Sequence, residues 1–107
     1  MADTFVSALQ SNPQASTLTI LYTASAATVI SSITICNTGG TPATFSISIA
    51  VAGAADILSQ YIYYKVPIPP NSTFIATVGI SLLNTDLIRV WASSPLLSFN
   101  AFGVTVA

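Results

Sequence analysis

The chain has 107 residues, of which 52% are hydrophobic and only 5% are charged, against roughly 25% charged residues in ordinary globular chains. High hydrophobicity with little charge excludes an intrinsically disordered chain. The formal net charge of −1 comes from two basic and three acidic residues. Two basic residues cannot form a phosphate-binding surface, so we expect no nucleic-acid partner. Serine and threonine interrupt every apolar run before it reaches the length of a membrane-spanning helix, so we expect no membrane partner.

The N-terminal residues 1–13 are predicted to form an arm or a short edge strand over residues 4–9, and residues 14–107 are predicted to form one domain. We favour an arm, because the segment is short and ends in Asn12-Pro13. It lacks the basic region and continuous apolar run of a secretory signal.

Alternation of apolar and polar residues with period two dominates the chain and is clearest over residues 44–51. There the apolar positions are Phe45, Ile47, Ile49 and Val51. Strict alternation is typical of a strand with one buried face. Residues 29–36 alternate less cleanly, and a turn with Gly39, Gly40 and Pro42 follows them. This arrangement predicts an antiparallel hairpin between the two strands.

Other alternating stretches predict strands over residues 16–23, 57–66, 72–80, 87–93 and 97–106. The alanine-rich residues 24–27 are interpreted as a loop, and residues 50–55 as a strand end that runs into a loop around Gly53. About seven to eight strands with regular turn signals predict an all-β fold, a single antiparallel β-sandwich of the jelly-roll or Ig-like kind.

The sequence contains little that could support catalysis. It has no histidine, the commonest general base and metal ligand, and its only cysteine, Cys36, is expected to be buried. Of the aspartates Asp3, Asp56 and Asp86, the last two are the only plausible facing pair. Because both follow turn-forming residues, we expect each to accept bonds from nearby backbone N–H groups instead. We therefore predict no enzyme, with no catalytic, cofactor-binding or metal-binding residues.

Aromatic and basic residues near the middle and end of the chain form a candidate interface. Tyrosine, tryptophan and arginine are enriched in protein interfaces, and tyrosines with a tryptophan would also suit a sugar. Alternation predicts that the first, third and fifth residues of Tyr61–Lys65 share one face. Trp91 and Arg89 share a strand face, which is either a contact patch or, as we favour, a core tryptophan with the arginine at the rim. The candidates are Tyr61, Tyr63, Tyr64, Lys65, Arg89 and Trp91.

No charged residue occurs between Asp3 and Asp56. Isolated sandwiches usually protect their sheet edges with charge, especially lysine. A chain whose surface is covered by other subunits needs less of this protection. We therefore expect a protein that is packed into an assembly, and a homo-oligomer.

Several strand and turn patterns of the chain together suggest a family. They are Leu21-Tyr22-Thr23-Ala24, residues 28–33, 35–39, 44–50 and 52–56, Tyr63-Tyr64 before Pro67-Ile68-Pro69, and residues 98–103. On these stretches the chain resembles a family of small all-β bacteriophage virion structural proteins over about residues 20–103. The resemblance implies a non-enzymatic structural protein, with no cofactor, that is located in the virion and assembled in the bacterial host cytoplasm. Its leading form is a capsid decoration (cement) protein that binds the major capsid protein. The first alternative is an accessory protein of the tail, neck or baseplate, and a further alternative is a carbohydrate-binding module.

Overall fold

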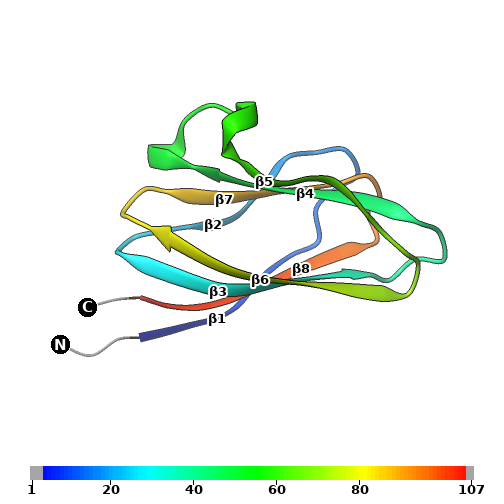
Figure 1. Ribbon diagram of the computed structural model, residues 1–107, viewed down its shortest axis with the longest axis horizontal. Helices are drawn as coiled ribbons and strands as arrows, with labels where there is room; N and C mark the ends of the chain where they lie inside the picture. Colours follow the sequence, from blue (N-terminus) through cyan, green and yellow to red (C-terminus); the bar gives the residue numbers. More distant parts are fainter. Residues whose placement is uncertain (1–3, 106–107) are drawn as a thin grey trace.

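The computed structural model describes residues 4–105, which form two packed antiparallel sheets of four strands each, a β-sandwich (Figure 1). This confirms the predicted all-β class. Two short 3-10 turns, η1 (Val51–Gly53) and η2 (Leu58–Gln60), lie between β4 and β5. The strands are β1 (Thr4–Ser11), β2 (Thr19–Thr23), β3 (Thr28–Asn37), β4 (Ala43–Ala50), β5 (Tyr61–Ile68), β6 (Ser72–Leu82), β7 (Leu87–Ala92) and β8 (Leu97–Thr105).

The strand order identifies the sandwich as a jelly roll rather than an Ig-like fold. One sheet has the order β1-β8-β3-β6 and the other β2-β7-β4-β5. The chain can be drawn as one long hairpin of two arms, β1–β4 and β5–β8, with the β4–β5 connection at its tip. Across this hairpin β1 pairs with β8, β2 with β7, β3 with β6 and β4 with β5. That hairpin is rolled up so that β3 also pairs with β8, and β4 with β7. A rolled eight-strand hairpin of this kind is a double-sheet jelly roll.

The hydrophobic core lies between the two sheets and is supplied by alternate residues of the strands. The predicted inward face of residues 72–80 is confirmed, since Ala76 and Ile80 are buried and Phe74 and Val78 pack against the core. The alternation predicted for β7 also holds. The largest fully buried apolar side chains are Phe45, Phe99, Ile30, Ile33, Ile35, Ile47, Ile68, Leu82, Ile88, Leu97 and Val90.

The predicted hairpin between residues 29–36 and 44–51 is wrong, because β3 and β4 lie in different sheets. The loop between them crosses the sandwich and is fixed by Asn37, which is 1% exposed. Its Nδ2 donates to the carbonyls of Thr41 (2.9 Å) and Ile68 (3.2 Å), and its Oδ1 accepts the N–H of Gly39 (3.0 Å). Glycine and proline serve a crossing loop as well as a hairpin, so their presence does not distinguish the two.

The N-terminal segment forms an edge strand where the structure describes it. Thr4–Ser11 is β1, which pairs with β8 on one side of the sandwich. The side chain of Asn12 then donates to the carbonyls of Pro95 (2.8 Å) and Leu97 (2.6 Å), which fixes the turn after β1. Residues 1–3 of the predicted arm, including Asp3, lie outside the described residues.

Charge is distributed unequally between the two sheets. The charged residues of the described chain lie in β5, in β7 and in the loops next to the β2-β7-β4-β5 sheet, whereas β1, β8, β3 and β6 contain none. The outward side chains of β8, β3 and β6 are mostly serine, threonine and asparagine, with Val29, Ile75 and Phe102 exposed among them. We call this surface the uncharged face.

Candidate functional site

Four of the six predicted interface residues surround one hollow on the outer side of the β2-β7-β4-β5 sheet. The hollow has a volume of about 310 Å³, at the lower end of the range for ligand pockets. We call it the aromatic hollow. Its lining residues are Ser16, Leu18, Ser46, Asp56, Tyr61, Tyr64, Lys65 and Trp91.

Two bulges in β5 place the tyrosines. The pairing of β4 with β5 passes from Phe45–Val66 to Ile47–Tyr63 and then to Ser48–Tyr61, so β5 contributes one extra residue in each interval. A bulge of this kind reverses which side chains face outward. Lys65 lies in the first bulge, with φ of 49°, and its N–H donates to the hydroxyl of Ser46 (2.8 Å).

The alternation predicted for residues 61–65 is therefore wrong. Tyr63 points into the sandwich, where its ring lies 6.0 Å from that of Phe45 and 5.6 Å from that of Phe74. Tyr61 and Tyr64 both lie on the hollow, with ring centroids 5.1 Å apart in an edge-on arrangement. The extra residues cannot be recognised by counting positions, since counting assumes an unbroken period of two.

The predicted core location of Trp91 is also wrong. Its neighbours Val90 and Ala92 are buried in the core, whereas Trp91 is half-buried on the outer side of β7. The Lys65 ammonium lies 5.6 Å from the centre of the Trp91 ring and 5.5 Å from that of Tyr64. A lysine between two aromatic faces is held by cation–π attraction, so these three residues form a preorganised group at the hollow.

The segment that contains η1 and η2 folds over the outer side of the same sheet (Figure 1). Arg89 on β7 donates from Nη1 to the carbonyl of Ala54 (2.9 Å), so it anchors the segment rather than lining the hollow. Ser46 and Ser48, on the outer side of β4, are also buried. The Ser48 hydroxyl has no hydrogen-bond partner among the described residues, and such a group is a local cost to stability.

Asp56 belongs to this covering segment and accepts a hydrogen bond from the Tyr61 hydroxyl (2.9 Å). Partial burial, the hydrogen bond to Asp56 and the negative charge of that carboxylate together raise the pKa of Tyr61. The tyrosine is therefore a neutral donor near neutral pH. The other four lining residues were not predicted for this site, because they lie on three separate segments that only the fold brings together. They are Ser16, Leu18, Ser46 and Asp56.

Asp86 is a structural residue, as predicted, and it ties the β6–β7 turn to η1. Its Oδ1 accepts the N–H of Ala52 (2.8 Å) and its Oδ2 accepts the N–H of Leu83 (2.9 Å). The hydrogen bonds from these two backbone groups hold the pKa of the Asp86 carboxyl below its ordinary value. Ala52 adopts a left-handed conformation with φ of 54°, so the carboxylate stabilises a strained turn.

We expect Asp86→Asn to lower the melting temperature at pH 7, because an amide can accept only one of the two bonds. Because the pKa of Asp86 is lower in the folded state, the ionised carboxylate stabilises the fold at pH values above the unfolded pKa of about 4. This stabilisation is lost as the pH falls through the folded-state pKa and the carboxylate is protonated. The difference in melting temperature from the parent should therefore shrink as the pH falls below about 4. Thermal unfolding followed by circular dichroism measures it, with Asp56→Asn as the control for net charge. A difference that stays constant down to pH 2 would contradict this role.

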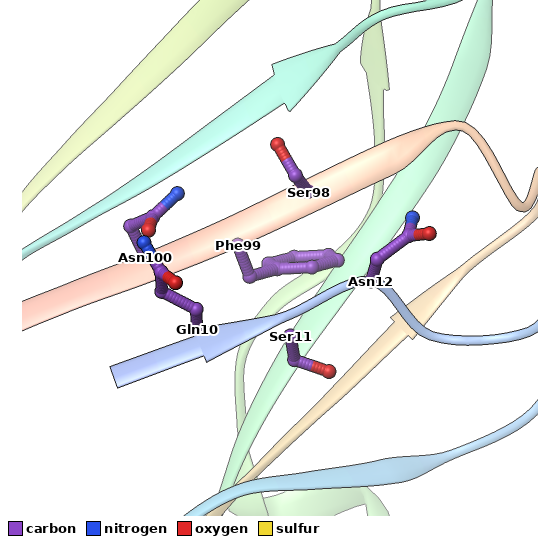
Figure 2. A pocket seen from close by; sticks show the side chains of 6 residues that line it. All are labelled: Gln10, Ser11, Asn12, Ser98, Phe99 and Asn100. Atoms are coloured by element: carbon purple, nitrogen blue, oxygen red, sulfur yellow. The ribbon is translucent and has the colours of Figure 1, made fainter. Parts of the chain in front are cut away.

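A second hollow, of about 380 Å³, lies along β1 and β8. Figure 2 shows the paired Gln10 and Asn100 side by side on one side of the strands, with the Phe99 ring between them and Asn12. The lining residues are polar and uncharged apart from this one ring. Gln10 and Asn12 are exposed, and Asn100 is half-buried. No group in this hollow titrates near neutral pH, and we assign it no ligand.

The cysteine, the potential metal ligands and the helices of the described chain lie apart from these hollows or contribute no site. Cys36, expected to be buried, is half-buried on the outer side of β3. Within residues 4–105, no group of three or more histidine, cysteine or acidic side chains is placed to hold a metal ion. No helix in the same part of the chain is long and apolar enough to cross a membrane.

The sequence matches no protein-family model, and a search of curated proteins found no significant match. The fold, the aromatic hollow and the uncharged face are therefore the features that bear on function.

Proposed function

We propose that this protein is a non-enzymatic structural component of a bacteriophage particle, and that it decorates the capsid by binding the major capsid protein through the uncharged face. The observation that supports the proposal most strongly is the absence of charge from all four strands β1, β8, β3 and β6. Interfaces are depleted in charged residues at their centres. A solvated sheet face normally carries them for solubility.

The composition of the uncharged face fits contact with a protein. Ile75 is 63% exposed and Phe102 40% exposed, and they are surrounded by hydroxyl and amide side chains that can bond to a partner's backbone. Apolar anchors within a polar surround are typical of protein interfaces. The resemblance to phage virion proteins supports the same class. An accessory role in the tail, neck or baseplate uses the same kind of surface, and the number of copies per particle distinguishes these locations.

The first experiment is quantitative mass spectrometry of purified virions of the phage that encodes the chain. A copy number comparable to that of the major capsid protein supports decoration. A small symmetric number per particle supports the tail, neck or baseplate, and absence from the particle removes the virion proposal.

The docking surface can be tested by adding one charge to it. Phe102→Lys should weaken binding to particles at least tenfold, since an unpaired charge buried in an interface costs about 1.4 kcal/mol or more. Leu58→Lys is the matched control, because Leu58 is an exposed apolar residue of η2 on the other side of the sandwich. Co-sedimentation of each variant with particles lacking the protein measures the difference. Loss of binding by Leu58→Lys alone would move the docking surface to the η1–η2 segment.

A carbohydrate-binding module is the second candidate, and the aromatic hollow is the observation that favours it. Trp91 and Tyr64 offer ring surfaces, while Asp56 and Lys65 offer a carboxylate and an ammonium that could bond to sugar hydroxyls. The contact between Lys65 and the Trp91 ring competes with stacking of a sugar there, so we place this function second. Trp91 is the only tryptophan, so its fluorescence during titration with host-surface glycans tests the candidate directly.

A further inference from the structure

The four sheet edges of the sandwich differ in how they are protected against pairing with another chain. β2 has only five residues. β5 carries Lys65, Pro67 and two bulges, and β1 contains a bulge between Val6 and Leu9. Short strands, lysine, proline and bulges are the devices by which edges avoid pairing. β6 has eleven residues with no charge and no proline, so it is the least protected edge.

Part of β6 is also a regular template. Within the described residues, β6 pairs with β3 alone. Residues 72–77 pair with β3 without interruption, and the register shift lies beyond them, between the pairs Ser32–Thr77 and Ile30–Ile80. In an antiparallel pair, alternate residues turn both N–H and C=O away from the partner strand. The free side of residues 72–77 therefore presents a straight row of backbone donors and acceptors.

We propose that two copies of the chain pair through their β6 edges, antiparallel, about a two-fold axis at Ile75. The pairing joins the four-stranded β1-β8-β3-β6 sheets of the two copies into one continuous eight-stranded sheet. This inference concerns the free protein in solution, so it does not depend on the proposed attachment to a capsid.

The side chains of residues 73–77 fit this register. On the outer side, Ile75 lies opposite Ile75 of the second copy, and Thr73 lies opposite Thr77. β-branched pairs and threonine pairs are favourable neighbours across strands. On the inner side, Phe74 lies opposite Ala76, which places a large side chain against a small one, as dense packing requires. Pairing would also shield Ile75, which is 63% exposed in a single copy.

The lack of charge favours a second copy as the occupant of this edge. A two-fold axis places each residue opposite the same short segment of its own sequence, so any charge near the axis would face its own kind. β6 has no charge along its whole length. At the β5 edge, the corresponding contact would bring two copies of Lys65 together. β6 therefore meets the requirement for self-pairing and β5 does not.

The oligomeric state of the purified full chain tests the proposal. Light scattering after size exclusion should give twice the mass of one chain. Ile75→Lys, which sets two lysines against each other at the axis, should give a monomer at the same concentration. Ser81→Lys should remain dimeric, because Ser81 is exposed on the same strand but lies outside residues 72–77. Circular dichroism on both variants establishes that they fold.

A cysteine variant tests the register without relying on a disruptive change. In a Cys36→Ser background, Ile75→Cys should form a disulfide-linked dimer under mild oxidation, because directly opposed residues approach to about 5 Å between Cβ atoms. Leu83→Cys, which is equally exposed but lies beyond β6, should form at least tenfold less dimer. The proposal is overturned if the parent chain is monomeric at all concentrations, if Ile75→Lys stays dimeric, or if both cysteines crosslink equally. A monomeric parent would leave the β6 edge open to a strand of a different protein.

Discussion

Gly103→Ala should be the most damaging small substitution in this protein. Gly103 lies in β8, between its pairing partners Val6 on β1 and Ile30 on β3. A Cβ atom at this position would collide with the carbonyl oxygen of Val29 and lie 2.9 Å from the Cα of Ile30. Both atoms belong to the backbone, so no side-chain rotation can relieve the clash.

The strands would have to separate, and we expect a loss of about 3 kcal/mol or more in the free energy of unfolding. For a domain of this size the loss corresponds to a fall in melting temperature of roughly 15 °C. Thermal unfolding followed by circular dichroism measures it.

Gly79→Ala is the matched control for this prediction. Gly79 also lies within a strand, β6, and a Cβ added there would meet nothing within 4 Å. We expect its melting temperature to stay within a few degrees of the parent's, because exposed strand positions tolerate alanine. Equal melting temperatures for the two variants would show that β3 and β8 can separate without cost, which would contradict the packing described at this position.

Strand positions were predictable from the sequence where the period of two is unbroken. β6 faces the core with the residues that alternation predicts, because neither the pattern nor the burial is interrupted over most of its length. In β7 alternation separates the two sides of the strand correctly, but the side with Trp91 was predicted to face the core and faces outward instead. Which strands pair was harder to predict. The β3–β4 loop looks like a hairpin, yet it crosses between sheets, because the buried side chain of Asn37 bonds across the loop to Thr41 and to Ile68. Such long-range bonds leave no mark in the local pattern.

The candidate site was predictable in composition but not in geometry. Tyr61, Tyr64 and Lys65 share the hollow with Trp91, whereas Tyr63 faces the core. The two bulges in β5 cause this difference, and each depends on how β4 and β5 pair rather than on the residues of β5 alone. The location of Trp91 was missed for a related reason. The core positions of β7 are already filled by Ile88, Val90 and Ala92, so the tryptophan lies outside.

The unequal distribution of charge connects the fold to the proposed function. The β2-β7-β4-β5 sheet covers its own outer side with the η1–η2 segment, which Arg89 and Asp86 anchor through bonds to Ala54 and Ala52. The other sheet has no such cover within the described chain. Its uncharged face and its unprotected β6 edge are therefore the surfaces on which we expect other proteins to bind, the face for the particle and the edge for a second copy.

Phe45→Ala should give the second large effect, because the ring of Phe45 packs against two aromatic rings of the other sheet. It is fully buried, and its ring lies 6.0 Å from Tyr63 of its own sheet, and 5.2 Å and 6.3 Å from Phe74 and Phe99 of the other. Removing a buried phenylalanine side chain costs about 3–5 kcal/mol through lost burial and the cavity left behind. We therefore expect urea unfolding, followed by the fluorescence of the single tryptophan, to shift to a much lower midpoint.

Phe102→Ala is the control for this change, since the same ring is removed from the uncharged face, where it is 40% exposed. We expect it to cost about 1 kcal/mol or less in the free energy of unfolding, as is usual for surface substitutions.

The Phe45→Ala variant should also affect the aromatic hollow. Tyr63 borders the bulge that contains Tyr64 and Lys65. Loss of Phe45 therefore frees Tyr63 and should disturb the group formed by Tyr64, Lys65 and Trp91 before the sandwich unfolds. A change in Trp91 fluorescence at urea concentrations where circular dichroism is still native would reveal this coupling. Coincident transitions by the two probes would show that the hollow is held by the outer side of the sheet alone.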